Sequence, residues 1–130
     1  MFDKDSFSDE QFNIAIKVCE QNDLKAAWSN EAIELWFILH FEYLNTAINR
    51  EIYIQKLNKY FTKYSIKTGK YQKNIENIYE ILNEYGDMSK AIVNAKKLEE
   101  NFKKEGSFSK KNPSTNVYEL IEELLDYLES

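Results

Sequence analysis

The stretch NEAIELWFILHFEYL, residues 30–44, is apolar on nearly every side and constrains the fold more than any other feature. Read as a helix, it carries hydrophobic side chains all round its axis, so most of its surface must be buried. The preceding LKAAWS, residues 24–29, is short and apolar between polar breaks and predicts a buried strand. A brief extended segment from Phe2 to about Asp5, then a helix capped by Ser8, come earlier. Strand, helix, strand and helix in this order predict an α/β fold with parallel strands.

After Asn45 the chain becomes a series of amphipathic helical patterns, at residues 49–64, 74–86 and 87–106. A final helix is predicted with Asn112 as its cap and Pro113 in its first turn. Its apolar stripe comprises Val117, Leu120, Ile121, Leu124, Leu125 and Leu128. Only three glycines and one proline occur, which favours long helices. We therefore predict an α/β but mostly helical protein, with an α/β part at residues 1–45 and a helical region at 46–130 packed on it.

Charge and cysteine content narrow the classes of function. The net charge of −5 argues against a basic protein that coats nucleic acid, but a metal-dependent nuclease concentrates acids at its site and stays possible. A single cysteine, Cys19, excludes an internal disulfide framework and a zinc-ribbon ligand set. The chain has no apolar run of about 18 residues and no signal-peptide pattern. We expect a cytoplasmic protein that does not associate with membranes.

Asp3 and Asp5 form an Asp-x-Asp pair directly after the first two residues. Alternate residues of a strand face the same side, so the predicted strand would present both carboxylates together. Two adjacent carboxylates repel each other unless a cation lies between them, and Mg²⁺ needs few protein ligands because it keeps much of its water. The simpler alternative is a solvated acidic tail.

The segment around the apolar helix holds several polar residues of interest. Ser29 and Asn30 are placed to cap the helix that follows them, which is the simpler interpretation of both. Glu34 lies on the most apolar helix, where a carboxylate is costly unless it is paired or binds a metal. His40 is the only histidine, and beside Trp36 and Phe37 a hydrogen-bonded core role is favoured over a ligand role.

Two surfaces are candidates for binding partners. Residues 56–73 are rich in lysine, including Lys63, Lys67, Lys70 and Lys73, and aromatic residues are interleaved with them. Lysines attract phosphate and aromatic rings stack on bases, so this is the expected nucleic-acid face. The alternative, a lysine-rich solvent face over a tyrosine-lined core, carries more weight. The leucine stripe of the last helix is expected to pack into the protein's own core, with docking on another chain as the alternative.

Three strings together resemble the RloB-like family of bacterial proteins: MFDKDSF, SNEAIELWFILHFEY and NPSTNVYELIEELL. The resemblance spans nearly the whole chain. That family is similar to Toprim-domain proteins and is associated with phage-defence and abortive-infection loci. The resemblance implies a partial Toprim-like sheet and metal-dependent cleavage of nucleic acid, with Asp3 and Asp5 as the catalytic pair that holds Mg²⁺. Ser29, Asn30, Glu34, His40, Asn112, Ser114 and Thr115 match motif positions whose role is unknown.

The chain departs from the Toprim pattern at its start. A Toprim site also uses a glutamate after an earlier strand, and no residue here precedes Met1. We therefore expect the C-terminal portion of a longer protein, from a truncated gene, a misassigned start or an excised piece. Its activity alone would be weak or absent. Phe2, Trp28 and part of the 31–44 helix would then face water, a rearranged helix or another chain, for example in a homodimer. The competing hypothesis is a non-catalytic helical module that binds a partner defence protein or nucleic acid.

Overall fold

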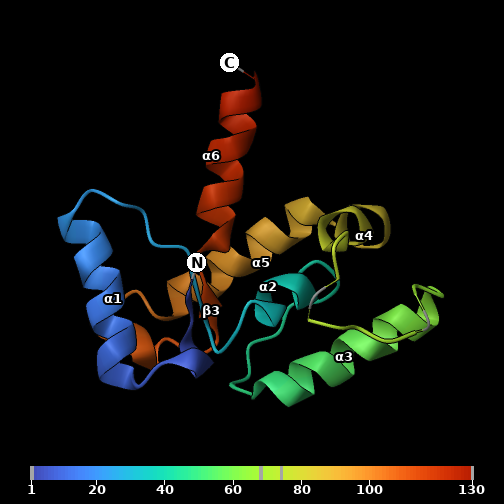
Figure 1. Ribbon diagram of the computed structural model, residues 1–130, viewed down its shortest axis with the longest axis horizontal. Helices are drawn as coiled ribbons and strands as arrows, with labels where there is room; N and C mark the ends of the chain where they lie inside the picture. The colour runs from blue at the N-terminus through green and yellow to red at the C-terminus, as the bar shows by residue number, and fades with distance from the viewer. Residues whose placement is uncertain (1, 68, 74, 130) are drawn as a thin grey trace.

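The computed structural model describes residues 2–67, 69–73 and 75–129, and it is mostly helical with a small sheet. Helices and short strands alternate in its first third, and helices dominate the rest (Figure 1). In chain order the elements are β1 (Phe2–Asp3), η1 (Lys4–Ser6), α1 (Asp9–Gln21), β2 (Trp28–Asn30), α2 (Glu34–Ile38), α3 (Arg50–Lys63), α4 (Ile78–Tyr85), α5 (Met88–Asn101), η2 (Phe108–Lys110), β3 (Ser114–Thr115) and α6 (Val117–Glu129). The predicted α/β, mostly helical class is confirmed. No helix among these residues is long and apolar enough to cross a bilayer.

The sheet has the order β1-β2-β3 and is mixed rather than parallel throughout. β1 runs parallel to β2, with Phe2 opposite Trp28 and Asp3 opposite Ser29. β3 runs antiparallel to β2, with Thr115 opposite Ser29. The predicted parallel fragment is therefore confirmed for β1 and β2, while the third strand comes from a segment expected to begin a helix. The buried strand itself begins later than expected, at Trp28.

The larger core surrounds α2, whose side chains are all buried against α3, α4, α5 and the first turn of α6. The prediction of one helix over residues 30–44 is wrong, because α2 ends at Ile38. A side-chain amide and a backbone N–H from the α5 region donate hydrogen bonds to the carbonyl oxygens that would accept from the next turn of a longer helix. The Asn94 amide donates to the Leu39 carbonyl at 2.9 Å, and the Asp87 backbone N–H donates to the His40 carbonyl at 3.0 Å.

A smaller core lies between α1 and the sheet. Phe12, Ile16 and Trp28 form its buried centre, and half-buried Phe2 and Phe108 pack on them. Ser8 caps α1 as predicted, and its side chain and that of Gln11 each accept from the other residue's backbone N–H. The expectation that Trp28 faces water is wrong, whereas Phe2 is half-buried and Tyr43 of the 31–44 segment is 40% exposed. Trp28 is 6% exposed because the rings of Phe12 and Phe108 contact it edge-on.

The last helix also begins later than predicted. Asn112 does not cap it: the Asn112–Pro113 peptide bond is cis, β3 follows, and α6 begins at Val117. Asn116, just before the helix, is bonded to the segment leading into β2. Its Oδ1 accepts from the Trp28 backbone N–H at 2.7 Å, and its Nδ2 donates to the Ala26 carbonyl at 2.7 Å. α6 then leaves the body of the protein, and its C-terminal end stands apart from the other helices (Figure 1).

The helices expected at 49–64 and 87–106 are confirmed as α3 and α5, and α4 begins at Ile78. The division at residue 45 stays a prediction.

Candidate functional site

Three carboxylates from separate segments converge on one guanidinium group. Asp3 closes β1, Asp5 lies in η1 and Glu34 opens α2; we call these three residues the acidic cluster. Arg50, the first residue of α3, reaches all of them. Its Nη2 donates to Asp3 Oδ2 at 2.5 Å, its Nη1 lies 3.1 Å from Asp5 Oδ2, and its Nε lies 3.2 Å from Glu34 Oε1. The two aspartates named from the sequence are thus brought together, and Glu34 joins them.

The two aspartates meet for a different reason from the one predicted. β1 is only two residues long, so strand alternation does not place Asp5. Instead the chain turns into η1, where the Asp5 backbone N–H donates to the Glu31 carbonyl at 3.1 Å. Asp3 is fixed from the other side, because its Oδ1 accepts from the Ile33 backbone N–H at 3.0 Å. Both contacts tie the Asp-x-Asp pair to the segment that joins β2 to α2.

Burial dominates the electrostatics of the acidic cluster. Glu34 is fully buried, and burial raises the pKa of its carboxyl while Arg50 lowers it. Burial likewise raises the pKa of Asp3; Arg50 opposes that effect and Asp5 adds to it. The ion pair between Glu34 Oε1 and Arg50 and the nearby Tyr71 hydroxyl compensate for the burial of this carboxylate. Three carboxylates against one guanidinium leave a site that favours additional positive charge.

Arg50 was missed by sequence reasoning, although two signals could have found it. It is the only arginine in the chain, and every other residue counted among its lysines and arginines is a lysine. It also lies in the first turn of a helix, where the helix dipole disfavours a cation. A cationic side chain at this end of a helix therefore indicates that a nearby carboxylate offsets the unfavourable interaction. A planar guanidinium fork, with several donors in fixed directions, can serve three carboxylates at once as a lysine cannot.

The motif residues Ser29, Asn30, Ser114 and Thr115 join the strands of the sheet rather than cap a helix. Ser29 Oγ and Thr115 Oγ1 are 2.8 Å apart in a hydrogen bond between two buried side chains. Asn30 Nδ2 donates to the carbonyl oxygens of Phe108 and Ser109. The capping role expected for Ser29 and Asn30 is therefore wrong, since both lie in β2. Asn112 Oδ1 is buried without a hydrogen-bond partner among the described residues.

His40 is a core residue, as the favoured interpretation predicted. Its ring is 1% exposed and packs edge-on against Trp36, with 4.9 Å between ring centroids. Nδ1 lies 2.9 Å from the Trp36 carbonyl, which can only accept, so Nδ1 carries the proton. Burial lowers the pKa of the imidazole. The ring lies beside Trp36 in the larger core, and among the described residues it forms no hydrogen bond or ion pair with the acidic cluster.

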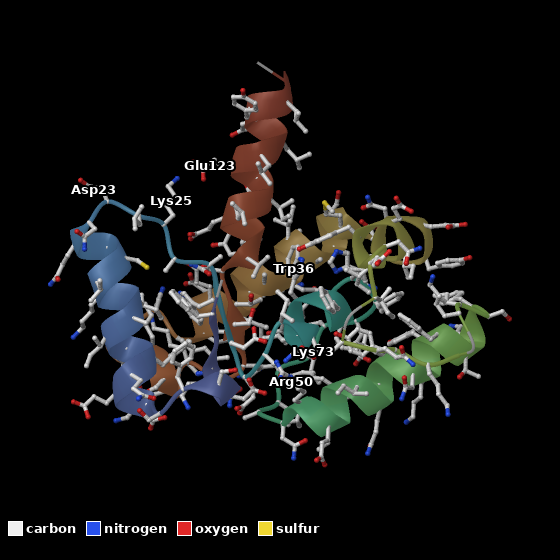
Figure 2. All side chains as sticks on the ribbon, in the orientation of Figure 1. Asp23, Lys25, Trp36, Arg50, Lys73 and Glu123 are labelled. Atoms are coloured by element: carbon white, nitrogen blue, oxygen red, sulfur yellow. The ribbon has the colours of Figure 1, made fainter. Side chains whose placement is uncertain are left out.

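The lysines of the predicted nucleic-acid face are exposed, but half of the aromatic residues among them are not available for stacking. Lys63 ends α3, and Lys67, Lys70 and Lys73 follow it in the connection to α4. Phe61 and Tyr71 are buried in the larger core. Among these four lysines, Lys73 acts on the acidic cluster: its charge lowers the pKa of Asp3 (Figure 2). Burial and the nearby Glu34 carboxylate raise the pKa of Tyr71, which places that ring beside the cluster too.

A protein-family model described as RloB-like protein matches residues 1–124 of the chain. No curated protein and no solved structure matches it.

Proposed function

The chain belongs to the RloB-like family, and from that premise we propose that its acidic cluster is the metal-binding part of a Toprim-type, magnesium-dependent nuclease acting in phage defence. One observation carries the proposal: two carboxylates of the Asp-x-Asp pair and a buried glutamate converge on a single cationic group. The arrangement supports a site built to hold positive charge. Arg50 provides that charge in this structure.

The residue types at the cluster fit magnesium. Carboxylate oxygens are the ligands this ion prefers, and it keeps several waters, so Asp3 and Asp5 would be enough to hold it. Glu34, fully buried and with only Oε1 in the ion pair with Arg50, suits a role in orienting ligand waters through Oε2. Among the described residues no group of three acids or histidines is spaced as a ready ligand set, because Arg50 lies between the carboxylates. When bound, the ion would stabilise charge on a phosphate and orient a water for its hydrolysis.

Arg50 and the lysines would bind the nucleic acid. The Arg50 side chain is 21% exposed at the entrance to the cluster, and a guanidinium fork matches phosphate as well as carboxylate. Lys73 lies close enough to act on Asp3 electrostatically. A phosphate backbone that runs past Lys63, Lys67 and Lys70 to Lys73 would be led by positive charge towards the acids. This assignment gives each basic residue a phosphate-contacting role.

The test is Mg²⁺ binding followed by cleavage of labelled DNA and RNA. We expect millimolar Mg²⁺ to raise the thermal midpoint of the wild-type chain, and to raise that of Asp3→Asn and Asp5→Asn much less. Any Mg²⁺-dependent cleavage should vanish in both variants. Asp9→Asn is the matched control, because Asp9 is a surface aspartate whose partner, Lys4, lies outside the cluster. Equal Mg²⁺ stabilisation in all three variants would overturn the assignment of the metal ligands.

A second candidate function is a non-catalytic helical module that binds a partner protein or nucleic acid. The observation that favours it is α6, whose leucines are exposed beyond its first turn. This function predicts that Asp3→Asn and Asp5→Asn leave partner binding unchanged, and that substitutions on α6 abolish it.

A further inference from the structure

Among the described residues, the buried side chains of α6 belong to its N-terminal part. Val117 is fully buried and Tyr118 is 7% exposed, and Ile121 packs at the edge of the larger core. Side-chain contacts with α5 also lie in the first half of the helix: Tyr118 donates to Glu99, and Lys96 lies 3.1 Å from Glu122. Beyond these residues the helix rises away from the other elements (Figure 1). The expectation that its leucine stripe packs into the protein's own core is therefore wrong for the outer half.

The outer half exposes a continuous apolar face. Leu124 is 51% exposed and Leu128, one turn later, is 77% exposed. Leu120 and Leu125 lie on the same side at helical spacing and are 38% and 42% exposed. We call Leu120, Leu124, Leu125 and Leu128 the α6 stripe. Single exposed leucines are ordinary, but a contiguous stripe on a projecting helix is typical of an interaction surface.

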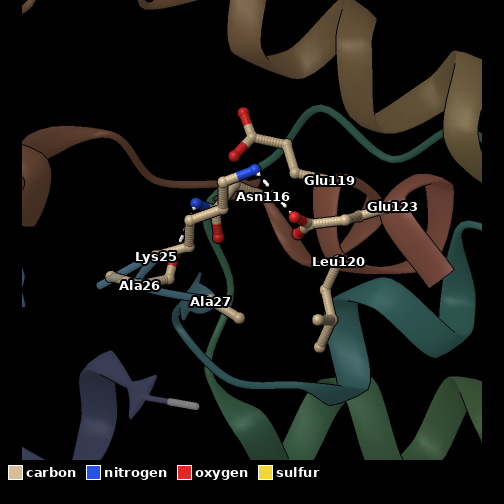
Figure 3. A pocket seen from close by; sticks show the side chains of 7 residues that line it. All are labelled: Lys25, Ala26, Ala27, Asn116, Glu119, Leu120 and Glu123. Carbon is tan, nitrogen blue, oxygen red and sulfur yellow. Dashed lines mark hydrogen bonds and ion pairs between the residues drawn. The ribbon is translucent and has the colours of Figure 1, made fainter. Parts of the chain in front are cut away.

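A pocket of about 280 Å³ adjoins the base of the α6 stripe. Leu120 belongs to both, and Ala26 and Ala27 supply the rest of the pocket's apolar lining (Figure 3). Two carboxylates, Glu119 and Glu123, lie at its α6 side. Lys25 Nζ pairs with Glu123 Oε1 at 3.1 Å, but both side chains are more than half exposed, so water and other ions compete for that pair.

The charge around the stripe indicates what covers it. α6 contains Glu119, Glu122, Glu123, Asp126 and Glu129 and no lysine or arginine. At helical spacing the first four of these acids, at residues 119–126, occupy the side opposite the stripe and reach both of its edges. Glu119 and Glu123 outnumber the one base at the pocket, Lys25, and burial together with the neighbouring Glu99 raises the pKa of Glu119. A second copy of α6 would bring like charges together along both edges of the stripe, which disfavours self-association through this face.

We propose that the α6 stripe and the adjoining pocket dock an amphipathic helix of a partner protein whose apolar face is edged with lysine or arginine. The partner's apolar residues cover Leu124, Leu125 and Leu128, and its basic residues face the acids at the edges. One basic side chain enters the pocket between Glu119 and Glu123, with its aliphatic stem against Leu120. This inference does not depend on metal chemistry at the acidic cluster, so the two can fail separately.

The test uses the full chain and a labelled helical peptide of about 18 residues, five turns, made of leucine and lysine. A matched leucine and glutamate peptide has the same apolar face and the opposite charge. We expect fluorescence anisotropy to show binding of the lysine peptide and none of the glutamate peptide. Leu124→Asp with Leu128→Asp should weaken binding about tenfold or more, although it makes the protein more acidic.

A control pair separates docking from general attraction between an acidic protein and a basic peptide. Ile14→Asp with Val18→Asp adds the same charge at the same spacing on α1, where these residues are 50% and 49% exposed. The proposal expects wild-type affinity or slightly tighter binding in this control. Leu124→Ala with Leu128→Ala, which preserves helix propensity, should also weaken binding, and circular dichroism checks folding. Equal binding by all variants, or α6-dependent self-association in sedimentation experiments, would overturn the proposal.

Discussion

Arg50 shows how one side chain can settle the charge of a whole site. Without it, Asp3, Asp5 and the fully buried Glu34 would repel one another at short range. Removing one member of a buried ion pair leaves the other charge uncompensated, which costs far more than losing a surface pair. A divalent cation bound by the acidic cluster would occupy the space between the carboxylates that the Arg50 guanidinium fills. Arg50 and Mg²⁺ are therefore expected to compete for the acidic cluster.

This competition predicts the behaviour of Arg50→Met. Its free energy of unfolding should fall by about 3 kcal/mol in the absence of divalent ions, because three carboxylates lose their cation. Millimolar Mg²⁺ should restore more stability to this variant than it adds to the wild type. Urea unfolding with and without Mg²⁺ measures both effects. Lys56→Met, on the same helix, removes a looser pair with Glu42 at 3.8 Å and should cost less than about 1 kcal/mol in either condition.

His40 predicts a pH dependence of stability. Burial lowers the pKa of the imidazole in the folded state. If Nε2 were protonated, its N–H would be buried with no hydrogen-bond acceptor among the described residues. The unfolded chain therefore binds a proton near the ordinary pKa of about 6.5 while the folded chain resists it. The stability that His40 contributes is present above that pH and is lost as the pH falls below it.

His40→Leu isolates this contribution, because the chain has no other histidine. The variant should lose about 1 kcal/mol at pH 7.5 with the hydrogen bond to the Trp36 carbonyl. Its free energy of unfolding should then fall less than that of the wild type between pH 7.5 and 5.5. Urea unfolding across this range provides the comparison. Parallel curves for the two proteins would show that His40 accepts a proton in the folded state.

At the scale of elements, local signals predicted helices well and long-range contacts decided what they missed. The Ser8 cap and the amphipathic patterns of α3 and α5 depend on neighbouring residues, and these helices lie where expected. α2 is short because Asn94 and Asp87, far along the chain, bond the carbonyls of residues 39 and 40. β3 replaces a predicted helical turn because residues 114 and 115 pair with β2. No periodicity within these segments carries that information.

For the candidate site too, the sequence identifies individual residues, whereas long-range contacts determine how they come together. The Asp-x-Asp pair was visible as a string, and Glu34 was marked by its place in an apolar helix. Their convergence depends on the parallel pairing of β1 with β2 and on the turn at η1, which no local pattern encodes. Arg50 is 45 residues beyond Asp5 in sequence, and only the packing of α3 against α2 brings them together.

At the scale of the whole molecule, the acidic cluster lies where the two cores meet. Asp3 and Asp5 lie between Phe2 and Phe7, which pack on the smaller core. Glu34 and Arg50 begin α2 and α3, which build the larger one. The ion pairs therefore connect elements that otherwise bury their apolar side chains in different places. Loosening the smaller core should release the aspartates while leaving Glu34 and Arg50 in position.

Phe12→Ala tests this arrangement against Leu98→Ala, since both residues are fully buried, one in each core. Each substitution should cost about 3 kcal/mol through lost contacts and the cavity that remains. Hydrogen exchange should accelerate chiefly in α1 for Phe12→Ala and chiefly in α5 for Leu98→Ala. Mg²⁺ should stabilise Phe12→Ala less than it stabilises Leu98→Ala, because β1 carries Asp3 into the site. Uniform loss of protection in both variants would mean that the two cores unfold as one unit, and the acidic cluster would then report on global stability alone.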